Sequence, residues 1–317
     1  MLRYRTFHNS DPPVLADIWR SRTAASGWTQ PISVDLLEQM VFGKPYFDGA
    51  GLILALDEKR PVGFAHGAFG PSPSQDRISA ETGVTCLVAV RPDCREAEVA
   101  AGLLRESEQY LRSRGAKVLQ GGAARPLAPF YFGLYGGSEP PGVLKSDTVS
   151  LQLYRSHGYA EADQRCVLQC RLDSFRPPVD RQQMHWRRKM LVEQRADPPL
   201  RSWWEACLLG NFDLTRFALI PRDGGPPAAT ATFRTIDPPC APVQGRGEGL
   251  IDMEVSRQWR RKGLATFLLS EAFRQLARQG VATIETQTSR SNDASLALLA
   301  KLQLKPVAEG IVFRKEA

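Results

Sequence analysis

The chain has 317 residues, about twice the length of a typical domain, so two domains are expected. Hydrophobic residues make up 43% and charged residues 24% of the sequence, which excludes a disordered, collagen-like or coiled-coil chain. Because no apolar run is long enough to span a bilayer and the N-terminus has no apolar signal core, we expect a cytoplasmic protein that does not bind membranes.

Most of the positive charge behind the net charge of +7 comes from dispersed arginine residues. The densest basic clusters are residues 186–189 and 260–262, and neither is a long basic tail. Dispersed charge alone does not indicate nucleic acid, so we expect no nucleic-acid partner. The six cysteines form no Cys-x-x-Cys pair and the four histidines are scattered, so we also expect no metal site.

Hydrophobic patterning predicts strands and helices along the whole chain. A first series consists of a strand over 1–8, helices over 13–24 and 33–41, strands over 51–56, 62–69 and 82–90, a helix over 96–114, a strand over 117–121, a helix over 148–156 and a strand over 166–172. A second series consists of a helix over 202–210, strands over 215–220, 228–236 and 249–255, a helix over 264–278, a strand over 282–288, a helix over 294–302 and a strand over 310–314.

An internal repeat accounts for the two series. The stretch 90–106 resembles the stretch 255–271 at a constant numerical offset of 165, and further along Ser150 matches Ser295 at an offset of 145. The first copy therefore contains an insertion, visible as the aromatic, Gly- and Pro-rich stretch 129–142, which we expect to be a loop. Its aromatic residues either contact substrate or pack against the domain.

The most informative motif is Arg260-x-x-Gly263-x-Ala265, which follows a strand ending at Val255 and begins an amphipathic helix. The first turn of a helix offers free N–H groups and the positive end of the helix dipole. Glycine and a small residue let a phosphate approach the backbone closely, and the basic run 260–262 adds positive charge. The motif predicts a diphosphate-binding loop, with a tight turn at the start of a basic surface helix as the alternative.

In its context this motif resembles the signature of the GNAT superfamily of N-acetyltransferases, in a tandem two-domain form. A later strand and Asn292-x-x-Ser295-x-x-Leu298 on a short helix match the order of elements in the family. The resemblance implies that acetyl-CoA binds as co-substrate, its pyrophosphate on the loop and its pantetheine on the preceding strand and the asparagine. The implied acetyl-CoA-binding residues are Met253, Val255, Arg260, Arg261, Lys262, Gly263, Leu264, Ala265, Thr266 and Asn292.

The first copy departs from the motif where the phosphate loop requires glycine. It has Glu98 at that position, with Glu96 close by, and carboxylates repel a diphosphate. Carboxylates at a helix N-terminus also stabilise the helix without any ligand. We predict that the first copy has a degenerate phosphate loop and does not bind CoA.

The candidate proton-transfer residues are divided between the copies. Tyr154, in Leu-Tyr-x-x-x-Gly, resembles the family's tyrosine that protonates the leaving thiolate, whereas the second copy has Leu299 there. A thiolate needs little acid help, so water, Ser291 or Ser295 are alternatives.

For the general base the candidates are Glu254, Glu248 and, third, Asp252. Each is equally explained as a solvated strand residue, and Tyr154 as core packing.

Several other residues have both a functional and a structural explanation. His66 lies in a strand and either faces a cleft or is hydrogen-bonded inside the protein. Trp186 and the Trp203-Trp204 pair are explained by core or domain-interface packing, with a stacking platform as the alternative.

The sequence therefore predicts an α/β (α+β) protein of two tandem GNAT-like domains, each a mostly antiparallel mixed sheet flanked by helices. The domains are predicted over 1–175 and 180–317, with a linker over 176–179. The expected function is acetyl-CoA-dependent N-acetyl transfer to a primary amine of a small molecule or peptide, by direct attack, in the C-terminal domain. The alternatives are a non-catalytic acyl-CoA-binding or partner-binding protein and, on net charge alone, a nucleic-acid binder.

Overall fold

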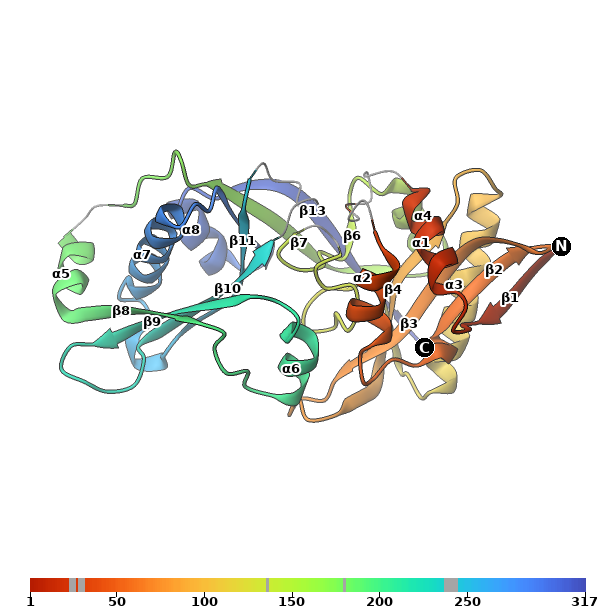
Figure 1. Ribbon diagram of the computed structural model, residues 1–317, viewed down its shortest axis with the longest axis horizontal. Coiled ribbons are helices and arrows are strands. Elements are labelled where there is room, and N and C mark those ends of the chain that lie inside the picture. Colours follow the sequence, from red (N-terminus) through yellow and green to blue (C-terminus); the bar gives the residue numbers. More distant parts are fainter. Residues whose placement is uncertain (23–26, 28–31, 135–136, 179–180, 237–244) are drawn as a thin grey trace.

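The computed structural model describes residues 1–22, 27, 32–134, 137–178, 181–236 and 245–317. Figure 1 shows an elongated molecule of two halves, with the strands β7 and β13 crossing the middle and connecting them. The chain therefore forms two α/β units that share strands.

The N-terminal half follows the predicted alternation. Its elements are β1 (Leu2–Thr6), α1 (Pro12–Arg20), α2 (Val34–Leu37) continued by a π-helical turn (Glu38–Phe42), a 3-10 turn (Gly49–Gly51), β2 (Leu52–Asp57), β3 (Arg60–Pro71), β4 (Ile78–Val90), α3 (Glu96–Ser113), β5 (Val118–Gly121), β6 (Val143–Leu144), α4 (Thr148–Ser156) and β7 (Ala160–Arg171). The predicted helix over 13–24 ends at Arg20, and residues 23 and 24 lie outside the described ranges.

The C-terminal half repeats this order with an additional helix, α5, at its start, with α6 alone in the place of α1 and α2, and with α8 directly after β12, where the N-terminal half has β6 before α4. Its elements are α5 (Arg181–Lys189), β8 (Met190–Ala196), α6 (Trp203–Leu209), β9 (Leu214–Pro221), β10 (Ala229–Ile236), β11 (Gly247–Val255), a 3-10 turn (Arg257–Trp259), α7 (Leu264–Arg278), β12 (Thr283–Ser289), α8 (Asp293–Lys301) and β13 (Lys305–Glu316). The sequence did not predict α5 or β8. Helix α5 is strongly polar, with only Gln183 and Trp186 buried, and β8 buries only Met190, so neither shows a clear hydrophobic period.

The strands form one continuous sheet in the order β1-β2-β3-β4-β5-β13-β7-β12-β11-β10-β9-β8, with β6 paired to β13. Pairing is antiparallel except between β4 and β5 and between β11 and β12, which are parallel. This confirms a mostly antiparallel mixed sheet flanked by helices in each half.

The two halves exchange their last strands. The final strand of the chain, β13, inserts between β5 and β7 of the N-terminal half, where Phe313 lies opposite Gly121 and Glu161. Conversely, β7 inserts between β12 and β13 of the C-terminal half, where Cys166 lies opposite Thr288 and Glu309. Each half therefore completes its sheet with a strand from the other.

The geometry reproduces the internal repeat residue by residue. The parallel pairing of residues 82–85 with 118–121 recurs, at the same numerical offset of 165, as 247–250 with 283–286. Cys86 on β4 and Ile251 on β11, equivalent at that offset, are the extra residues of matching β-bulges. Both α4 and α8 begin at a side-chain cap, Asp147 and Asn292, at the predicted offset of 145.

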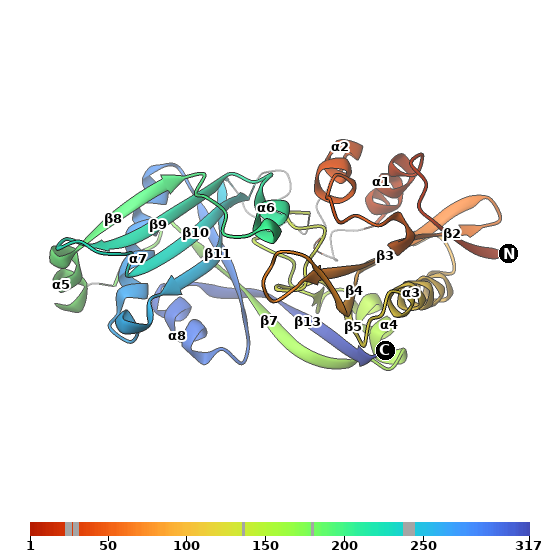
Figure 2. The same ribbon diagram turned by 90° about the horizontal axis from the view of Figure 1, so that it is seen from below.

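Helices cover both faces of the sheet. Figure 2 shows α1, α2 and α6 on one side and α3, α4 and α8 on the other. In the C-terminal half α7 packs against the sheet through Leu268 and Phe273, which join Phe233 in a buried cluster. None of the helices within the described ranges is both long and apolar enough to cross a membrane.

Candidate functional site

Strands β11 and β12 separate halfway along their length. They pair in parallel from Gly247 to Leu250, and beyond Leu250 no residue of β11 has a partner on β12. The bulge at Ile251 lies at this point, between Leu250 and Asp252. We call the gap between residues 251–255 and 287–289 the splay. It leaves this edge of β11 without a strand partner, although Arg125 and Arg260 donate to the carbonyls of Ile251 and Val255. An extended ligand can pair with the remaining edge groups.

The loop after β11 has the shape of an anion-binding turn. Arg261 and Gly263 adopt left-handed conformations, with φ of 62° and 74°. The first backbone hydrogen bond of α7 joins Phe267 N–H to the Gly263 carbonyl. The preceding N–H groups therefore have no intrahelical partner, and the 15-residue helix places its positive end at the same point.

Helix α5 fixes this loop from outside. Trp186 Nε1 donates to the Lys262 carbonyl at 2.7 Å, and Gln182 Nε2 donates to the same oxygen at 3.0 Å. Lys262 Nζ lies 5.3 Å from the centre of the Trp259 ring, and Trp259 in turn packs edge-on against Trp186. Trp186 is therefore a support for the loop, a role that the sequence did not predict.

The other predicted acetyl-CoA-binding residues surround the loop and the splay. Arg260 Nε donates to the Val255 carbonyl at 3.0 Å, which holds the end of β11 against the loop. Met253 and Val255 are half-buried and pack against the core beneath α7. Asn292 is exposed and caps α8, accepting a hydrogen bond from Ser295 N–H at 3.0 Å. Leu264 and Thr266 are buried in the first turn of α7, and Ala265 between them is half-buried.

The same place in the N-terminal half is closed by its own chain. Helix α3 begins at Glu96, three residues earlier in the repeat than α7, so helix replaces the left-handed loop. Arg22 lies 3.1 Å from the Glu96 carboxylate and 3.9 Å from that of Asp147. The cavity beside Tyr154 measures only about 20 Å³, room for about one water molecule. These contacts support the prediction that this half does not bind CoA.

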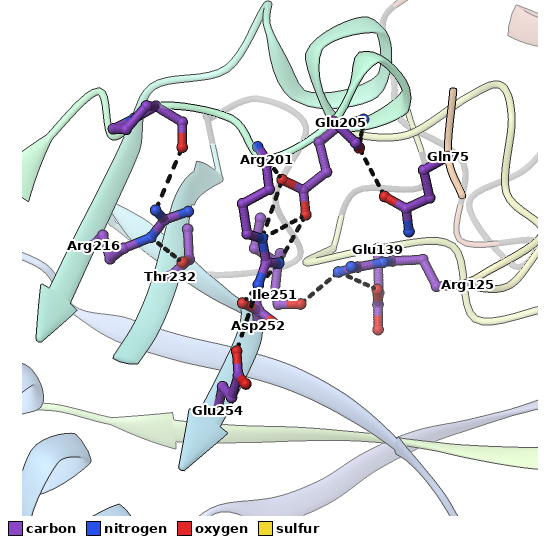
Figure 3. A network of polar contacts seen from close by, with 12 residues as sticks. Gln75, Arg125, Glu139, Arg201, Glu205, Arg216, Thr232, Ile251, Asp252 and Glu254 are labelled. Carbon is purple, nitrogen blue, oxygen red and sulfur yellow. Dashed lines mark hydrogen bonds and ion pairs between the residues drawn. The ribbon is translucent and has the colours of Figure 1, made fainter. Parts of the chain in front are cut away.

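An acidic cluster lies around Arg201 beside β11 (Figure 3). Arg201 donates to the Glu205 carboxylate at 2.7 Å and to Asp252 at 3.1 Å, and lies 3.7 Å from Glu254. Burial raises the pKa of Glu205, but the hydrogen bonds from Arg201 outweigh it and hold that pKa below its usual value. Three carboxylates thus share one guanidinium at the edge of the splay.

Glu248 does not belong to this cluster. It lies opposite Thr235, on the same face as Leu250 and the α7 core, and at the start of β11 rather than at the splay. Its carboxylate accepts a hydrogen bond from Thr235 Oγ1 at 3.1 Å, and burial raises its pKa. Glu248 therefore lies apart from the splay, whereas Asp252 and Glu254 lie at its edge.

Tyr154 is also remote from the splay. It lies on α4 in the N-terminal half, is 2% exposed, and stacks on Phe313 with 5.3 Å between ring centres. Its hydroxyl points to the Thr85 carbonyl at 3.4 Å. Its counterpart Leu299 is buried in the core beneath α7. Tyr154 is thus a packing residue with respect to the C-terminal site.

The N-terminal half supplies groups to the splay that the sequence did not indicate. Arg125 NH1 donates to the Ile251 carbonyl at 2.5 Å, as Figure 3 shows, and Gln287 Nε2 on β12 donates to the Glu139 carbonyl. Arg125 lies 3.6 Å from the Glu139 carboxylate, whose pKa is raised by burial. Arg125 precedes the insertion and Glu139 lies in it. Their contact with the splay depends on the packing of the two halves and could not be predicted from the sequence.

The insertion otherwise serves packing. Phe130, Tyr131 and Phe132 are buried, while the predicted contribution of Tyr135 lies outside the described residues. His66 is fully buried with Nδ1 2.9 Å from the Tyr131 hydroxyl, and burial lowers its pKa to about 3. His66 is therefore a neutral, hydrogen-bonded interior residue, and it also lines a cavity of about 260 Å³.

The tryptophans of α6 contact the N-terminal half. Trp204 packs against Tyr46 with 4.9 Å between ring centres, and Trp203 lies 6.0 Å from the same ring. Lys44 Nζ donates to the Cys207 carbonyl at 2.5 Å beside them. These contacts agree with domain-interface packing.

A cavity of about 630 Å³ opens beside the splay on the N-terminal side. We call it the inter-half cavity. Its floor is the uncovered face of β5, β13 and β7, and its walls come from residues 70–75 and 124–127. The polar and charged lining includes Gln75, Gln120, Arg125, Asp163, Arg165 and Arg314.

The fold and the splay define a class of protein. The sequence pattern of the Acetyltransferase (GNAT) family matches residues 16–131 and 181–303, one region in each half. The chain belongs to this family. Its fold is that of transferases that move an acyl group from acyl-CoA to an amine, here in a tandem arrangement. No curated protein matches the sequence.

Solved structures share the whole tandem fold at low sequence identity. A tandem GNAT protein from the clavulanic acid biosynthesis pathway, solved without AcCoA, is 14% identical over 100% of this chain and 98% of its own, with a TM-score of 0.66. A GCN5-related N-acetyltransferase from Sphaerobacter thermophilus is 17% identical over 99% and 95%, with a TM-score of 0.63. The glucosamine N-acetyltransferase region of a fungal GH3 beta-N-acetylglucosaminidase is 15% identical over 99% of this chain and 38% of that longer chain, with a TM-score of 0.71.

Proposed function

We propose that the protein is an acetyl-CoA-dependent N-acetyltransferase whose C-terminal half carries the reaction. One contrast between the halves carries this proposal. Both halves separate their parallel strands at the bulge, but the C-terminal half follows it with a left-handed loop at the start of α7, whereas the N-terminal half has helix and the Arg22–Glu96 ion pair in the equivalent place. The chain's own residues thus fit a diphosphate at one site and oppose it at the other.

The arrangement assigns a role to each part of the site. The free N–H groups at the start of α7, with the basic run 260–262, would hold the pyrophosphate, and the unpaired edge of β11 would hold the pantetheine. A strand N–H near the bulge at Ile251 would polarise the thioester carbonyl. The acceptor amine would reach the thioester from the α6 face, between the halves.

Direct attack by the amine requires removal of a proton. An ammonium group is not nucleophilic, so a carboxylate must accept its proton, directly or through water. Asp252 and Glu254 lie at the splay and are 26% and 63% exposed, so the more enclosed Asp252 is our preferred base. The thiolate that leaves needs little acid assistance, which is consistent with Leu299 in place of a tyrosine.

The missing tyrosine also supports a second candidate, a protein that binds acyl-CoA without transferring the acyl group. Leu299 is 3% exposed inside the core and provides no proton donor. Acetyl-CoA binding without release of free CoA thiol across a panel of amines would favour this second candidate.

The proposed reaction is tested by measuring CoA thiol release from acetyl-CoA with primary amines. We expect Asp252→Asn combined with Glu254→Gln to lower kcat/KM by about 100-fold, the usual size of general-base catalysis, with an unchanged Kd for acetyl-CoA. Glu193→Gln, on the exposed strand β8, is the matched control and should keep full activity. Wild-type activity in the double variant would exclude both carboxylates as bases.

A further inference from the structure

Two residues that line the inter-half cavity form hydrogen bonds with the two arms of the splay. Arg125, in its wall, donates to the Ile251 carbonyl on β11 at 2.5 Å. Asp163, in its floor, accepts a hydrogen bond from Ser289 Oγ at the end of β12, at 2.6 Å. A molecule that fills the cavity therefore lies one residue away from the splay, where the proposed thioester would lie.

The charge near the splay favours a cationic end. Glu205, Asp252 and Glu254 surround the single guanidinium of Arg201, so this cluster has a formal charge of −2. Such a cluster attracts an ammonium group and supplies carboxylates to take up its proton.

The charge inside the cavity has the opposite sign. Its lining contains three arginines and two acids, a formal charge of +1. Arg165 lies 2.9 Å from Asp163, and Arg125 pairs with Glu139 outside the lining. Arg314 is exposed and, among the described residues, takes part in no ion pair.

Glu81, the other acid in the lining, does not neutralise Arg314. Glu81 also has no ion pair within the described residues, but it lies just beyond the β4–β5 pairing, with β5 between it and Arg314 on β13. The planar guanidinium of Arg314 is thus free to bind a carboxylate or a similar anion through two hydrogen bonds.

The strand register gives the spacing between the two ends. On β13, Arg314 lies two residues from Val312, the partner of Asp163 on β7, and a bulge at Ala162 makes the same interval three residues long on β7. Two residues of strand span about 7 Å, and the splay lies beyond Asp163, so the two ends are at least about 7 Å apart. The amine and the anion of a free α-amino acid are too close together to satisfy both ends.

We infer that the acceptor is an amine with an anionic group at least about 7 Å away, such as the carboxylate of a short peptide, and that Arg314 in the inter-half cavity binds this anion. The inference rests on the proposed function, whose acceptor class it specifies. It makes the N-terminal half, which lacks a CoA loop of its own, the part that selects the substrate.

Triglycine and triglycinamide are matched probes, because they share a terminal amine and differ in the carboxylate. With acetyl-CoA and the full chain, we expect kcat/KM to be at least about tenfold higher for triglycine, as for a charge-assisted hydrogen bond. Arg314→Ala should remove the preference, Arg314→Lys should keep part of it, and Arg314→Glu should reverse it. Lys305→Ala, an exposed cation on the same strand but outside the cavity, should leave it unchanged.

Equal rates for the two peptides in the wild type, or an unchanged preference in Arg314→Ala, would overturn the inference while leaving the proposed function in place. Calorimetric titration of both peptides tests anion binding by Arg314 separately from the acetyl transfer. If no thiol is released but triglycine still binds more tightly through Arg314, the anion site stands and the proposed transfer fails. If neither peptide binds or reacts, the inference is wrong.

Discussion

At the scale of single residues, conformation and partners distinguish the two copies more sharply than residue type does. Gly263 and Glu98 occupy equivalent positions, yet one is left-handed at the mouth of a loop and the other is helical and pairs with Arg95 at 3.0 Å. Asp252 and Glu248 are both carboxylates of β11, and only the alternation of the strand around its bulge decides which faces the splay. The left-handed loop therefore distinguishes the two copies, and the bulge of β11 distinguishes the two carboxylates, more than the residue types do.

His66 provides a residue-scale prediction about pH. Its folded-state pKa of about 3 lies below the ordinary value of 6.5, so the unfolded chain binds a proton that the native state refuses. Stability is therefore fully present above pH 6.5 and falls as the pH drops toward 3, by about 2 kcal/mol at pH 5. We expect His66→Gln to flatten the decline in Tm between pH 7 and pH 5.

The matched control is His157→Gln, at the C-terminal end of α4 in the same half, which should keep the wild-type slope. The same slope in His66→Gln as in the wild type would show that His66 does not drive this dependence.

At the scale of elements, the sequence predicts those with a strong hydrophobic period and misses those that depend on their neighbours. The repeat at an offset of 165 located β11, α7 and β12 together with the loop between them. The polar helix α5 and the edge strand β8 have too few buried positions to show a period. The loop was predictable from local chemistry, whereas its support by α5 required the tertiary fold.

That support leads to a prediction for α5. Trp186→Phe keeps most of the buried ring but removes the hydrogen bond from Nε1 to the Lys262 carbonyl. Loss of about 1 kcal/mol at the loop should weaken acetyl-CoA binding by about fivefold, with little change in Tm. Titration calorimetry measures the affinity. Trp203→Phe, in the distant helix α6, is the control, and equal affinities in both variants would mean that α5 does not hold the loop.

At the scale of the whole molecule, the exchange of β7 and β13 makes the two copies interdependent. The predicted boundary at 176–179 separates them in the sequence, yet each sheet contains a strand from the other side of it. Arg125 and Glu139 reach the splay across the same interface, and no local pattern in the sequence announces such long-range contacts. The site and the fold therefore belong to the entire chain.

Interdependence predicts how separated halves behave. Expressed alone, residues 1–175 lack β13 and residues 180–317 lack β7, so each leaves a sheet with a missing strand in its interior. We expect neither half to show a cooperative thermal transition by circular dichroism, and co-expression to restore a single transition. Two independent transitions at the temperature of the full chain would contradict this account.

The central claim is that one of the two copies, the C-terminal one, binds acetyl-CoA through the loop at Gly263. Titration calorimetry of the full chain with acetyl-CoA tests it most directly, using Gly263→Glu beside Glu98→Gln, the variant at the equivalent position of the other copy. The account predicts one molecule bound per chain, binding lost in Gly263→Glu, and binding unchanged in Glu98→Gln. Two molecules per chain, or the same heat of binding with Gly263→Glu as with the wild type, would contradict it.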